Sequence, residues 1–172
     1  MTSTLKPDAG SSRRAPAFWT VFASLVASDV VTKQLAERHL LLHTPLEIAG
    51  GWLRLTLTYN TGAAMNLSLG GASRVVFTIV ALGMLLVIFQ MYRRTPRRDV
   101  GQAIALALIA AGAVGNVIDR LRSTRGVVDF IDVGVGDWRF WTFNVADMGV
   151  TTGAMLLALL LILRPEPQSP TA

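Results

Sequence analysis

The sequence contains no cysteine, which excludes a disulfide, a thiol nucleophile and a thiolate-bound metal. Its two histidines, His39 and His43, lie four residues apart but lack the HExxH pattern of zinc peptidases. We therefore expect no metal site and place both histidines at a membrane interface. Charge is also scarce, since 16% of the residues are charged and 52% are hydrophobic. Together with a clearly positive mean hydropathy, this balance excludes an ordinary soluble domain and indicates a membrane protein.

Four apolar runs are long enough to cross a bilayer, because about 20 helical residues span its hydrocarbon core. We therefore predict an all-α membrane protein in which a bundle of four transmembrane helices forms a single domain. The third run is rich in Ala and Gly, which favours close helix packing. The runs cover about residues 17–36, 75–92, 100–118 and 143–163, within a domain of residues 17–164. Residues 1–16 are predicted to be a disordered cytoplasmic tail and residues 165–172 a second cytoplasmic tail.

One segment outside these runs has the periodicity of a strand. From Leu53 to Asn60, large apolar residues alternate with Arg, Thr and Asn, and this period of two predicts a β-strand. The strand leads into the segment NTGAAMN, Asn60–Asn66, where Asn and Gly provide turn chemistry and small residues permit close approach of the backbone.

Arginines determine the predicted orientation in the membrane. Four of them lie within the six residues Arg93–Arg98, between the second and third runs, and such dense positive loops remain in the cytoplasm. Both chain ends then lie in the cytoplasm, and both long connections lie outside. Under this topology, polar residues from separate segments meet near the outer membrane surface. They are Asp29, Asn60, Asp119, Asp129 and Asp147.

Carboxylates beside or inside apolar runs are costly, so their presence indicates a function. The segment from Gly115 to Gly149 holds five of the eleven acidic residues of the chain. If its motif GVVDFIDV is extended, only one of Asp129 and Asp132 faces the helix bundle, because alternate side chains of a strand point in opposite directions. We expect Asp132 and Asp137 to be solvated loop acids.

Three helical segments combine an acid with a neighbouring polar group. Asp29 and Lys33 lie four residues apart and predict an ion pair, either to shape a nearby site or as a lysine at a helix end. Asp119 and Arg120 are expected to pair with each other at a helix end and to support the site. Amides precede two of the acids by three residues: Asn116 precedes Asp119, and Asn144 precedes Asp147 in a pattern close to a capping box.

Two carboxylates in a partly dry site share one proton readily, because both resist ionising side by side. One then acts as a general base on water and the other as a general acid for a leaving amine, which is the chemistry of peptide hydrolysis without a cofactor. Three alternatives stay open. A small transporter would use the acids as an ion relay, and a scaffold protein would use the third run as an interface. A serine–lysine hydrolase would use Ser28 and Lys33, although Asp29 tends to keep Lys33 charged.

Five short motifs, SDVVTK, YNTGAAMN, GNVIDR, VVDFID and FNVAD, follow one another along the chain. In this combination the chain resembles bacterial lipoprotein signal peptidase, also called signal peptidase II, from Phe18 to Leu163. The resemblance implies a four-helix membrane bundle with a small extracytoplasmic β-sheet, the cradle, and a mobile outer loop. It also implies an aspartic endopeptidase without cofactor or metal. Such an enzyme removes the signal peptide from diacylglyceryl-modified prolipoproteins, on the N-terminal side of the lipidated cysteine.

The resemblance also implies roles for particular residues. Asp129 and Asp147 correspond to the catalytic dyad of the family. The residues that it places around the dyad, for substrate binding or support, are Asn60, Asn116, Asp119, Arg120, Asn144, Asp29 and Lys33. One departure is visible, since Met65 stands where the family usually has phenylalanine after Asn-x-Gly-Ala-Ala. Methionine fills similar apolar space, so we expect changed packing and retained activity.

Location and partners follow from the same resemblance. It implies a multi-pass protein of the bacterial cytoplasmic (inner) membrane, with both termini in the cytoplasm and the active site at the outer, periplasmic face. The expected partners are lipid-modified prolipoprotein substrates, membrane phospholipid and globomycin-type inhibitors. We expect no nucleic-acid partner, and we expect the chain to act as a monomer.

Overall fold

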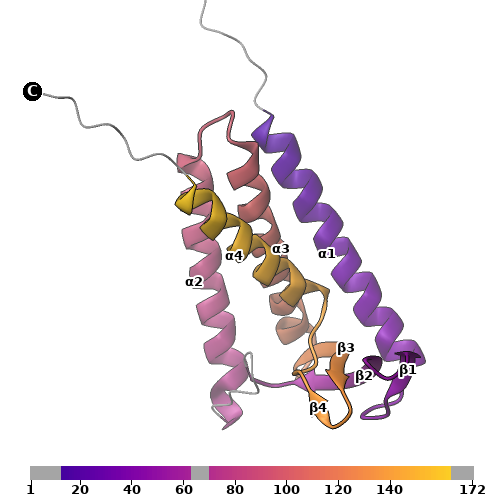
Figure 1. Ribbon diagram of the computed structural model, residues 1–172. Helices are drawn as coiled ribbons and strands as arrows, with labels where there is room; N and C mark the ends of the chain where they lie inside the picture. Colours follow the sequence, from indigo (N-terminus) through magenta and orange to yellow (C-terminus); the bar gives the residue numbers. More distant parts are fainter. Residues whose placement is uncertain (1–12, 63–69, 164–172) are drawn as a thin grey trace, which may run out of the picture.

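The computed structural model describes residues 13–62 and 70–163, which form four long helices with a small sheet at one end (Figure 1). The predicted fold class is confirmed, including the strand over residues 53–60. Met65 and the tail residues 1–12 and 164–172 lie outside the described residues. The helices are α1 (Arg14–His39), α2 (Ser73–Arg94), α3 (Val100–Arg122) and α4 (Val145–Ile162). The strands are β1 (Leu46–Ala49), β2 (Leu53–Asn60), β3 (Val127–Val135) and β4 (Trp138–Arg139).

Helix α1 begins earlier than predicted. Residues 14–16, which we expected in the disordered tail, form its first turn. Pro16 fits there because the first N–H groups of a helix have no partner within it. The Arg14 guanidinium donates a hydrogen bond to the carbonyl oxygen of Tyr92 at 3.2 Å and lies over the Tyr92 ring, 4.9 Å from its centroid. These contacts join the start of α1 to the end of α2, and hydrophobicity alone gives no signal of them.

Helix α3 is the centre of the bundle, and the other three helices all pack on it. Most of its residues are buried, and many of them are alanine or glycine. A side chain at Gly112 would collide with the backbone oxygen of Ala146, and one at Gly153 of α4 would press on the backbone oxygen of Ala105. The close packing predicted for the Ala- and Gly-rich run is therefore confirmed, and it brings α3 and α4 together.

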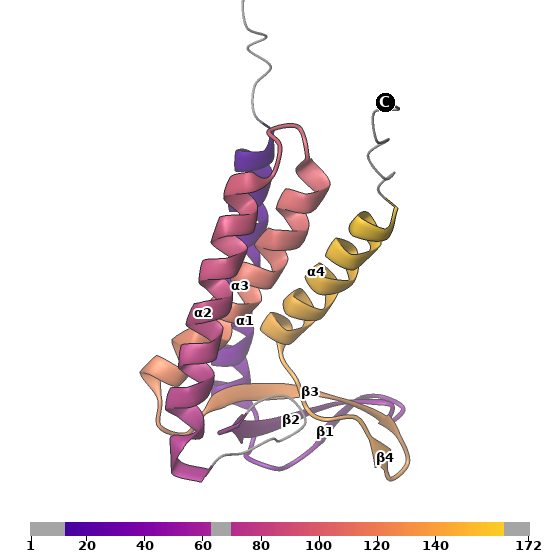
Figure 2. The same cartoon turned by 90° about the vertical axis from the view of Figure 1, so that its left-hand side faces the viewer.

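The sheet is antiparallel, with the strand order β1-β2-β3-β4. In the pairing of β2 with β3, Asn60 lies opposite Val127 and Thr58 lies opposite Asp129. Gly126, just before β3, has φ of +114° and lies so close to Asn60 that a side chain there would collide with the Asn60 carbonyl. The strands run across the ends of the helices, as Figure 2 shows, and so bring the polar ends of β2 and β3 under α1, α3 and α4.

All four helices are long and apolar enough to cross a membrane, judged by their length and composition. Helices α1, α2 and α4 leave many large apolar side chains exposed, as expected for surfaces that face lipid. The loop between α2 and α3, which holds the dense arginines, and the sheet lie at opposite ends of the bundle (Figure 1). The chain is therefore a multi-pass membrane protein with a sheet at one end of its helix bundle.

Candidate active site

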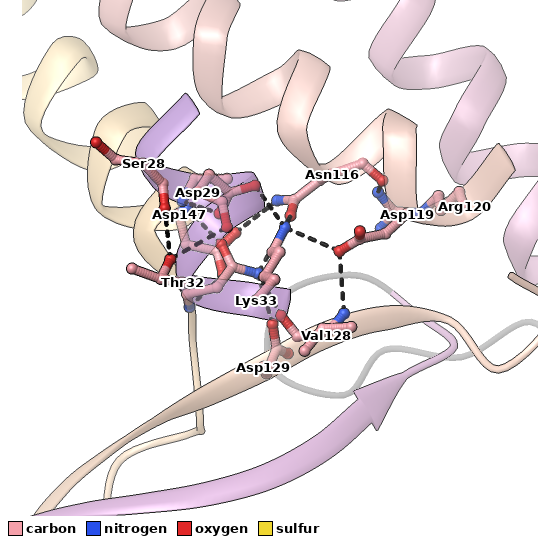
Figure 3. Close-up of polar contacts among 12 residues, drawn as sticks. Ser28, Asp29, Thr32, Lys33, Asn116, Asp119, Arg120, Val128, Asp129 and Asp147 are labelled. Carbon is pink, nitrogen blue, oxygen red and sulfur yellow. Dashed lines mark hydrogen bonds and ion pairs between the residues drawn. The ribbon is translucent and has the colours of Figure 1, made fainter. Parts of the chain in front are cut away.

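Segments far apart in the sequence meet where the helices reach the sheet. They are the last turns of α1 and α3, the start of α4, and the ends of β2 and β3 that lie beneath them. Their carboxylates, amides and one ammonium group form a connected polar network (Figure 3). All residues predicted for the site lie in this network or against it: Asp29, Lys33, Asn60, Asn116, Asp119, Arg120, Asp129, Asn144 and Asp147.

Asn144 connects Asp129 with Asp147. It is fully buried at the N-cap of α4, where its Oδ1 accepts from the backbone N–H of Asp147 at 2.9 Å. Asp147 Oδ2 in turn accepts from the backbone N–H of Asn144 at 3.2 Å, which completes the predicted capping box. The Asn144 Nδ2 group donates to Asp129 Oδ1 at 2.7 Å. One asparagine thus fixes the start of α4 and holds both aspartates at the same place.

Asp129 lies on β3 with 3% of its surface exposed. Burial, followed by the negative charge of Asp147, raises the pKa of Asp129 to about 7, while hydrogen bonds from Asn60 and Asn144 oppose this rise. An aspartic acid of this kind holds its proton at pH values where an ordinary aspartate is ionised. Asp129 is therefore suited to proton transfer near neutral pH.

Lys33 is the cation at the centre of the network, and it is 3% exposed. Its Nζ lies 2.8 Å from Asp29 Oδ2, which confirms the predicted ion pair along α1. It also lies 2.9 Å from Asp119 Oδ2 and donates to Asn116 Oδ1 at 3.0 Å. Two carboxylates from different helices thus share one ammonium group, an arrangement that sequence spacing gave no means of predicting.

The same two acids also hold the backbone beside Asp129 and Asp147. Asp29 Oδ1 accepts from the backbone N–H of Ala146 at 2.9 Å, one residue before Asp147. Asp119 Oδ2 accepts from the backbone N–H of Val128 at 3.1 Å, one residue before Asp129. The acids that pair with Lys33 therefore position the two chain segments that carry Asp147 and Asp129.

Asn116 links the lysine network to Asp147. Its Nδ2 donates to Asp147 Oδ1 at 2.8 Å, while its Oδ1 accepts from Lys33 and, at 3.2 Å, from Asn144 Nδ2. Because an amide is both donor and acceptor, a single side chain satisfies a carboxylate and an ammonium together. Asn116 thus keeps Asp147 close to the lysine network while the ammonium itself contacts other acids.

Gly115 is a part of the site that the sequence analysis missed. A side chain at this position would collide with Asp29 Oδ2 and would press on the Cβ of Ala146 at 3.2 Å. Only the absence of a side chain lets Asp29 pass between α3 and α4 to reach the Ala146 N–H. The available signal was the glycine that opens the GNVIDR motif, because a glycine inside a helix often marks close packing.

Arg120 was predicted to pair with Asp119, and this prediction is wrong. Among the described residues Asp119 forms its ion pair with Lys33, and the Arg120 guanidinium donates to two backbone carbonyls, Gly62 O at 3.0 Å and Asn116 O at 3.3 Å. Arg120 therefore holds the chain just after Asn60, and its charge acts on Asp147 and Asp129 from beside the site. The two neighbours in sequence point to different partners because they project from different faces of α3.

The expectation that Asp132 is solvated is also wrong. Asp132 is buried on β3, where it accepts from Thr56 Oγ1 at 3.1 Å and from Arg139 Nε at 2.9 Å. Because β3 alternates its side chains, Asp129 turns to the bundle while Asp132 turns to the far side of the sheet. Only Asp137, in the turn between β3 and β4, is exposed as expected.

Ionisable groups buried at one end of an apolar bundle are rare and mark functional sites. The fold and this network therefore define a membrane protein with a cluster of acids and amides of the kind that enzymes use for proton transfer. Residues 21–163 match the family model described as Signal peptidase (SPase) II. The chain belongs to this family of signal peptidases and is thus a peptide-bond hydrolase by membership.

Individual relatives agree with this assignment. A protein of Hydrogenovibrio crunogenus named lipoprotein signal peptidase is 42% identical over 139 residues, 78% of each chain. One of the same name from Coxiella burnetii is 38% identical over 151 residues, which cover 86% of this chain and 91% of that protein. A solved structure described as a bacterial membrane enzyme superposes with a TM-score of 0.79 at 28% identity and covers 90% of this chain and 93% of its own.

Proposed function

We propose that the chain is an aspartic endopeptidase that cleaves the signal peptide from diacylglyceryl-modified lipoprotein precursors, on the N-terminal side of the lipidated cysteine. The observation that carries this proposal is the position of Asn144. Its Nδ2 group donates a hydrogen bond to Asp129. Its backbone N–H donates to Asp147 Oδ2, and its Oδ1 accepts from the backbone N–H of Asp147. Among the described residues, neither aspartate forms an ion pair; neutral amides donate to both, and the negative charge of Asp147 raises the pKa of Asp129. Such a pair favours the state with one shared proton.

The geometry supports an assignment of roles within the pair. The raised pKa of Asp129, about 7, makes it the partner that keeps the proton, so it hydrogen-bonds the oxygen of the scissile carbonyl. Asp147 is the base, which takes a proton from a water molecule as the water oxygen attacks the carbonyl carbon. When the C–N bond breaks, a proton passes to the leaving amine, and the pair returns to its state with one proton. These steps use side chains of the chain and water alone.

The surrounding residues then act by position and charge. Lys33, Asp29, Asp119 and Asn116 hold the segments that carry the dyad. Asn60 and Arg120, which holds the chain just after Asn60, are the candidates to bind the substrate backbone. Dense arginines at the opposite end of the bundle favour a cytoplasmic position for that end. The site then faces the outer side of a bacterial cytoplasmic membrane, where a lipid-modified substrate arrives from the bilayer.

The test is cleavage of a purified prolipoprotein in detergent or lipid, with and without the diacylglyceryl group. Asp129→Asn and Asp147→Asn keep the shape of each side chain and remove its acid. Because general acid–base groups contribute about 10²–10⁴-fold to a rate, we expect each variant to lose at least about a hundredfold. Asp137→Asn is the matched control, since Asp137 is an exposed acid in the turn between β3 and β4, and it should cut like the wild type. Globomycin should block the wild-type reaction.

Circular dichroism must show that the silent variants are folded. The dyad and the substrate class are both supported if the wild type and the Asp137→Asn control cut only the lipidated precursor and both dyad variants cut neither precursor. A folded variant that cuts at the wild-type rate removes that aspartate from the mechanism. A wild type that cuts neither precursor overturns the proposal and returns attention to transport or scaffolding.

A further inference from the structure

The end of the sheet farthest from the site carries exposed apolar residues that the peptidase chemistry does not use. Trp138 is 75% exposed, Val135 is 76% exposed and Trp52 is 53% exposed. Val135 and Trp138 are paired across the β3–β4 hairpin, and the backbone N–H of Gly134 donates to the carbonyl of Trp52 at 2.9 Å. The three side chains therefore come from adjoining backbone. We refer to Trp52, Val135 and Trp138 as the aromatic tip.

The aromatic tip is held firmly by the side chain of Arg139. Its Nη1 donates to the carbonyl of Gly51 at 2.8 Å, its Nε donates to Asp132 Oδ1 at 2.9 Å, and its Nη2 donates to Asp132 O at 3.0 Å. One guanidinium thus joins the β1–β2 turn, β3 and β4. Since Asp132 is buried, these charge-assisted bonds are protected from solvent. The exposed side chains are consequently presented by a braced structure.

The position of the tip relative to the helices indicates what covers it. Helix α2 and the turn before it form a candidate span of 25 residues, roughly 37 Å long at 1.5 Å per residue, so its ends pass the hydrocarbon core of about 30 Å and reach the interface. The β3–β4 hairpin and the first turn of α2 reach the same level along the bundle in both views (Figures 1 and 2). Val75 and Ile79, in the first two turns of α2, are exposed and apolar at this level.

We infer that the aromatic tip binds the phospholipid interface of the outer leaflet and continues the lipid-facing surface of the helices. Tryptophan is enriched at this depth because its ring is apolar and its N–H remains in contact with headgroups or water. The half-exposed Phe140 and Trp141 extend the apolar surface from the tip toward the start of α4. The charged turn residue Asp137 is exposed between the paired Val135 and Trp138, where water and headgroups are available.

This contact has a consequence for the site. Strand β3 carries Asp129 and ends at Val135 of the tip, so a tip fixed in the interface sets the depth of Asp129 relative to the lipid surface. A substrate whose cleavage point is held by its own lipid anchor needs a site at a defined depth. Lipid binding by the tip does not itself depend on peptidase activity, and it can be measured without a substrate.

The experiment uses the full chain, purified and reconstituted in phosphatidylcholine–phosphatidylglycerol vesicles. A single-tryptophan variant keeps Trp138 and replaces Trp19, Trp52 and Trp141 by Phe, and lipids brominated near the headgroup or near the acyl-chain end serve as quenchers. We expect Trp138 emission to be quenched more strongly by the shallow bromine than by the deep one. A second variant that keeps only Trp19, an exposed residue of the spanning helix α1, is the matched lipid-facing control.

Two other results overturn the inference. Quenching of Trp138 by aqueous iodide with no effect of brominated lipid places the tip in water. If neither quencher affects Trp138, the tip is covered by protein. Dilution of the protein in excess lipid then tests whether that cover is a second copy of the chain, because such a contact is lost on dilution. If the triple replacement prevents folding, wild-type protein labelled with fluorotryptophan gives the same answer through broadening of the Trp138 fluorine signal by spin-labelled lipid.

Arg139→Ala should make the Trp138 depth less defined, whereas Arg38→Ala, at an exposed position of α1, should leave it unchanged.

Discussion

Two pairs of buried or half-buried carboxylates meet in this site and differ in the groups that hold them. Asp29 and Asp119 share the ammonium of Lys33 at 2.8 and 2.9 Å and use their remaining capacity on backbone N–H groups. Asp129 and Asp147 are held by the amides of Asn144 and Asn116 at 2.7 and 2.8 Å. The first pair shares one cation, whereas the second pair is held by neutral amides and the negative charge of Asp147 acts on Asp129.

The comparison shows how one residue type serves two purposes in one site. An ammonium at contact distance holds a carboxylate by charge as well as by hydrogen bonding, which suits an anchor. A neutral amide orients a carboxylate without adding a charge, and its hydrogen bonds only partly oppose the raised pKa of Asp129, which suits an acid or a base. Asp29 binds the N–H just before Asp147 and Asp119 binds the N–H just before Asp129, so the pair that shares Lys33 positions the pair held by amides.

The largest effect is expected from replacing Lys33 by Met, because this change removes the cation that distinguishes the first pair of acids from the second. It leaves the buried acids Asp29 and Asp119 without their cation, and removing one partner of a buried ion pair costs about 3–5 kcal/mol. We expect a loss of this size in the free energy of unfolding, measured by denaturation in detergent with circular dichroism. Arg38→Met, at an exposed position of the same helix, should have little effect.

A rescue experiment sharpens this prediction. In the triple variant Lys33→Met, Asp29→Asn and Asp119→Asn the buried charges are gone, while the amides can still accept from the backbone N–H groups. Stability should recover by a large part of the loss. If the triple variant is as unstable as Lys33→Met alone, the lysine acts by packing, and the distinction between the two pairs loses its basis.

The second prediction concerns the pH dependence of stability and follows from the raised pKa of Asp129. The folded state holds a proton on Asp129 up to about pH 7, whereas the unfolded chain releases it near the ordinary value of 3.8. Stability from this group is therefore present at low pH and is lost as the pH rises from about 4 to about 7. The gap of about three pKa units corresponds to up to roughly 4 kcal/mol. Asp129→Asn should become more stable relative to the wild type as the pH rises across this window.

Infrared spectroscopy of the carboxyl stretching band tests the cause of the shift. In Asp147→Asn the charge that is the second largest cause of the raised pKa is removed, while burial remains. The pKa of Asp129 should therefore fall and yet stay above 3.8. An unchanged titration in Asp147→Asn would show that the two carboxyls are not coupled and would remove the ground for a shared proton.

The smallest effect is expected from Gly115→Ala. The added methyl group collides with Asp29 and the start of α4, so it should push Asp29 from the Ala146 N–H and destabilise the fold by about 1–3 kcal/mol, the usual cost of overpacking. Gly83→Ala on α2 is the control, because a side chain there meets nothing within 4 Å. The measurement is thermal unfolding in detergent. Equal stability of both variants would contradict the role of Gly115.

Much of the fold could be predicted because hydrophobic runs and period-two alternation report directly on spans and strands. The β2 strand was found over its full length, from Leu53 to Asn60, since its side chains alternate. The Asp29–Lys33 pair and the capping box of Asn144 and Asp147 were also found, because both depend on spacing within a single helix. The helical start at Arg14 was missed because a contact with Tyr92, a distant residue, stabilises it.

The sequence by itself determined the membrane class and the number of apolar spans, because these depend on composition and on local periodicity. Only the tertiary structure decided which partner each group meets. Asp119 turns to Lys33 and away from its neighbour Arg120, and buried Asp132 binds Arg139. The physical reason is that partner choice for a buried charge depends on which helices and strands pack together, and close packing at residues without side chains, such as Gly115, makes those contacts possible.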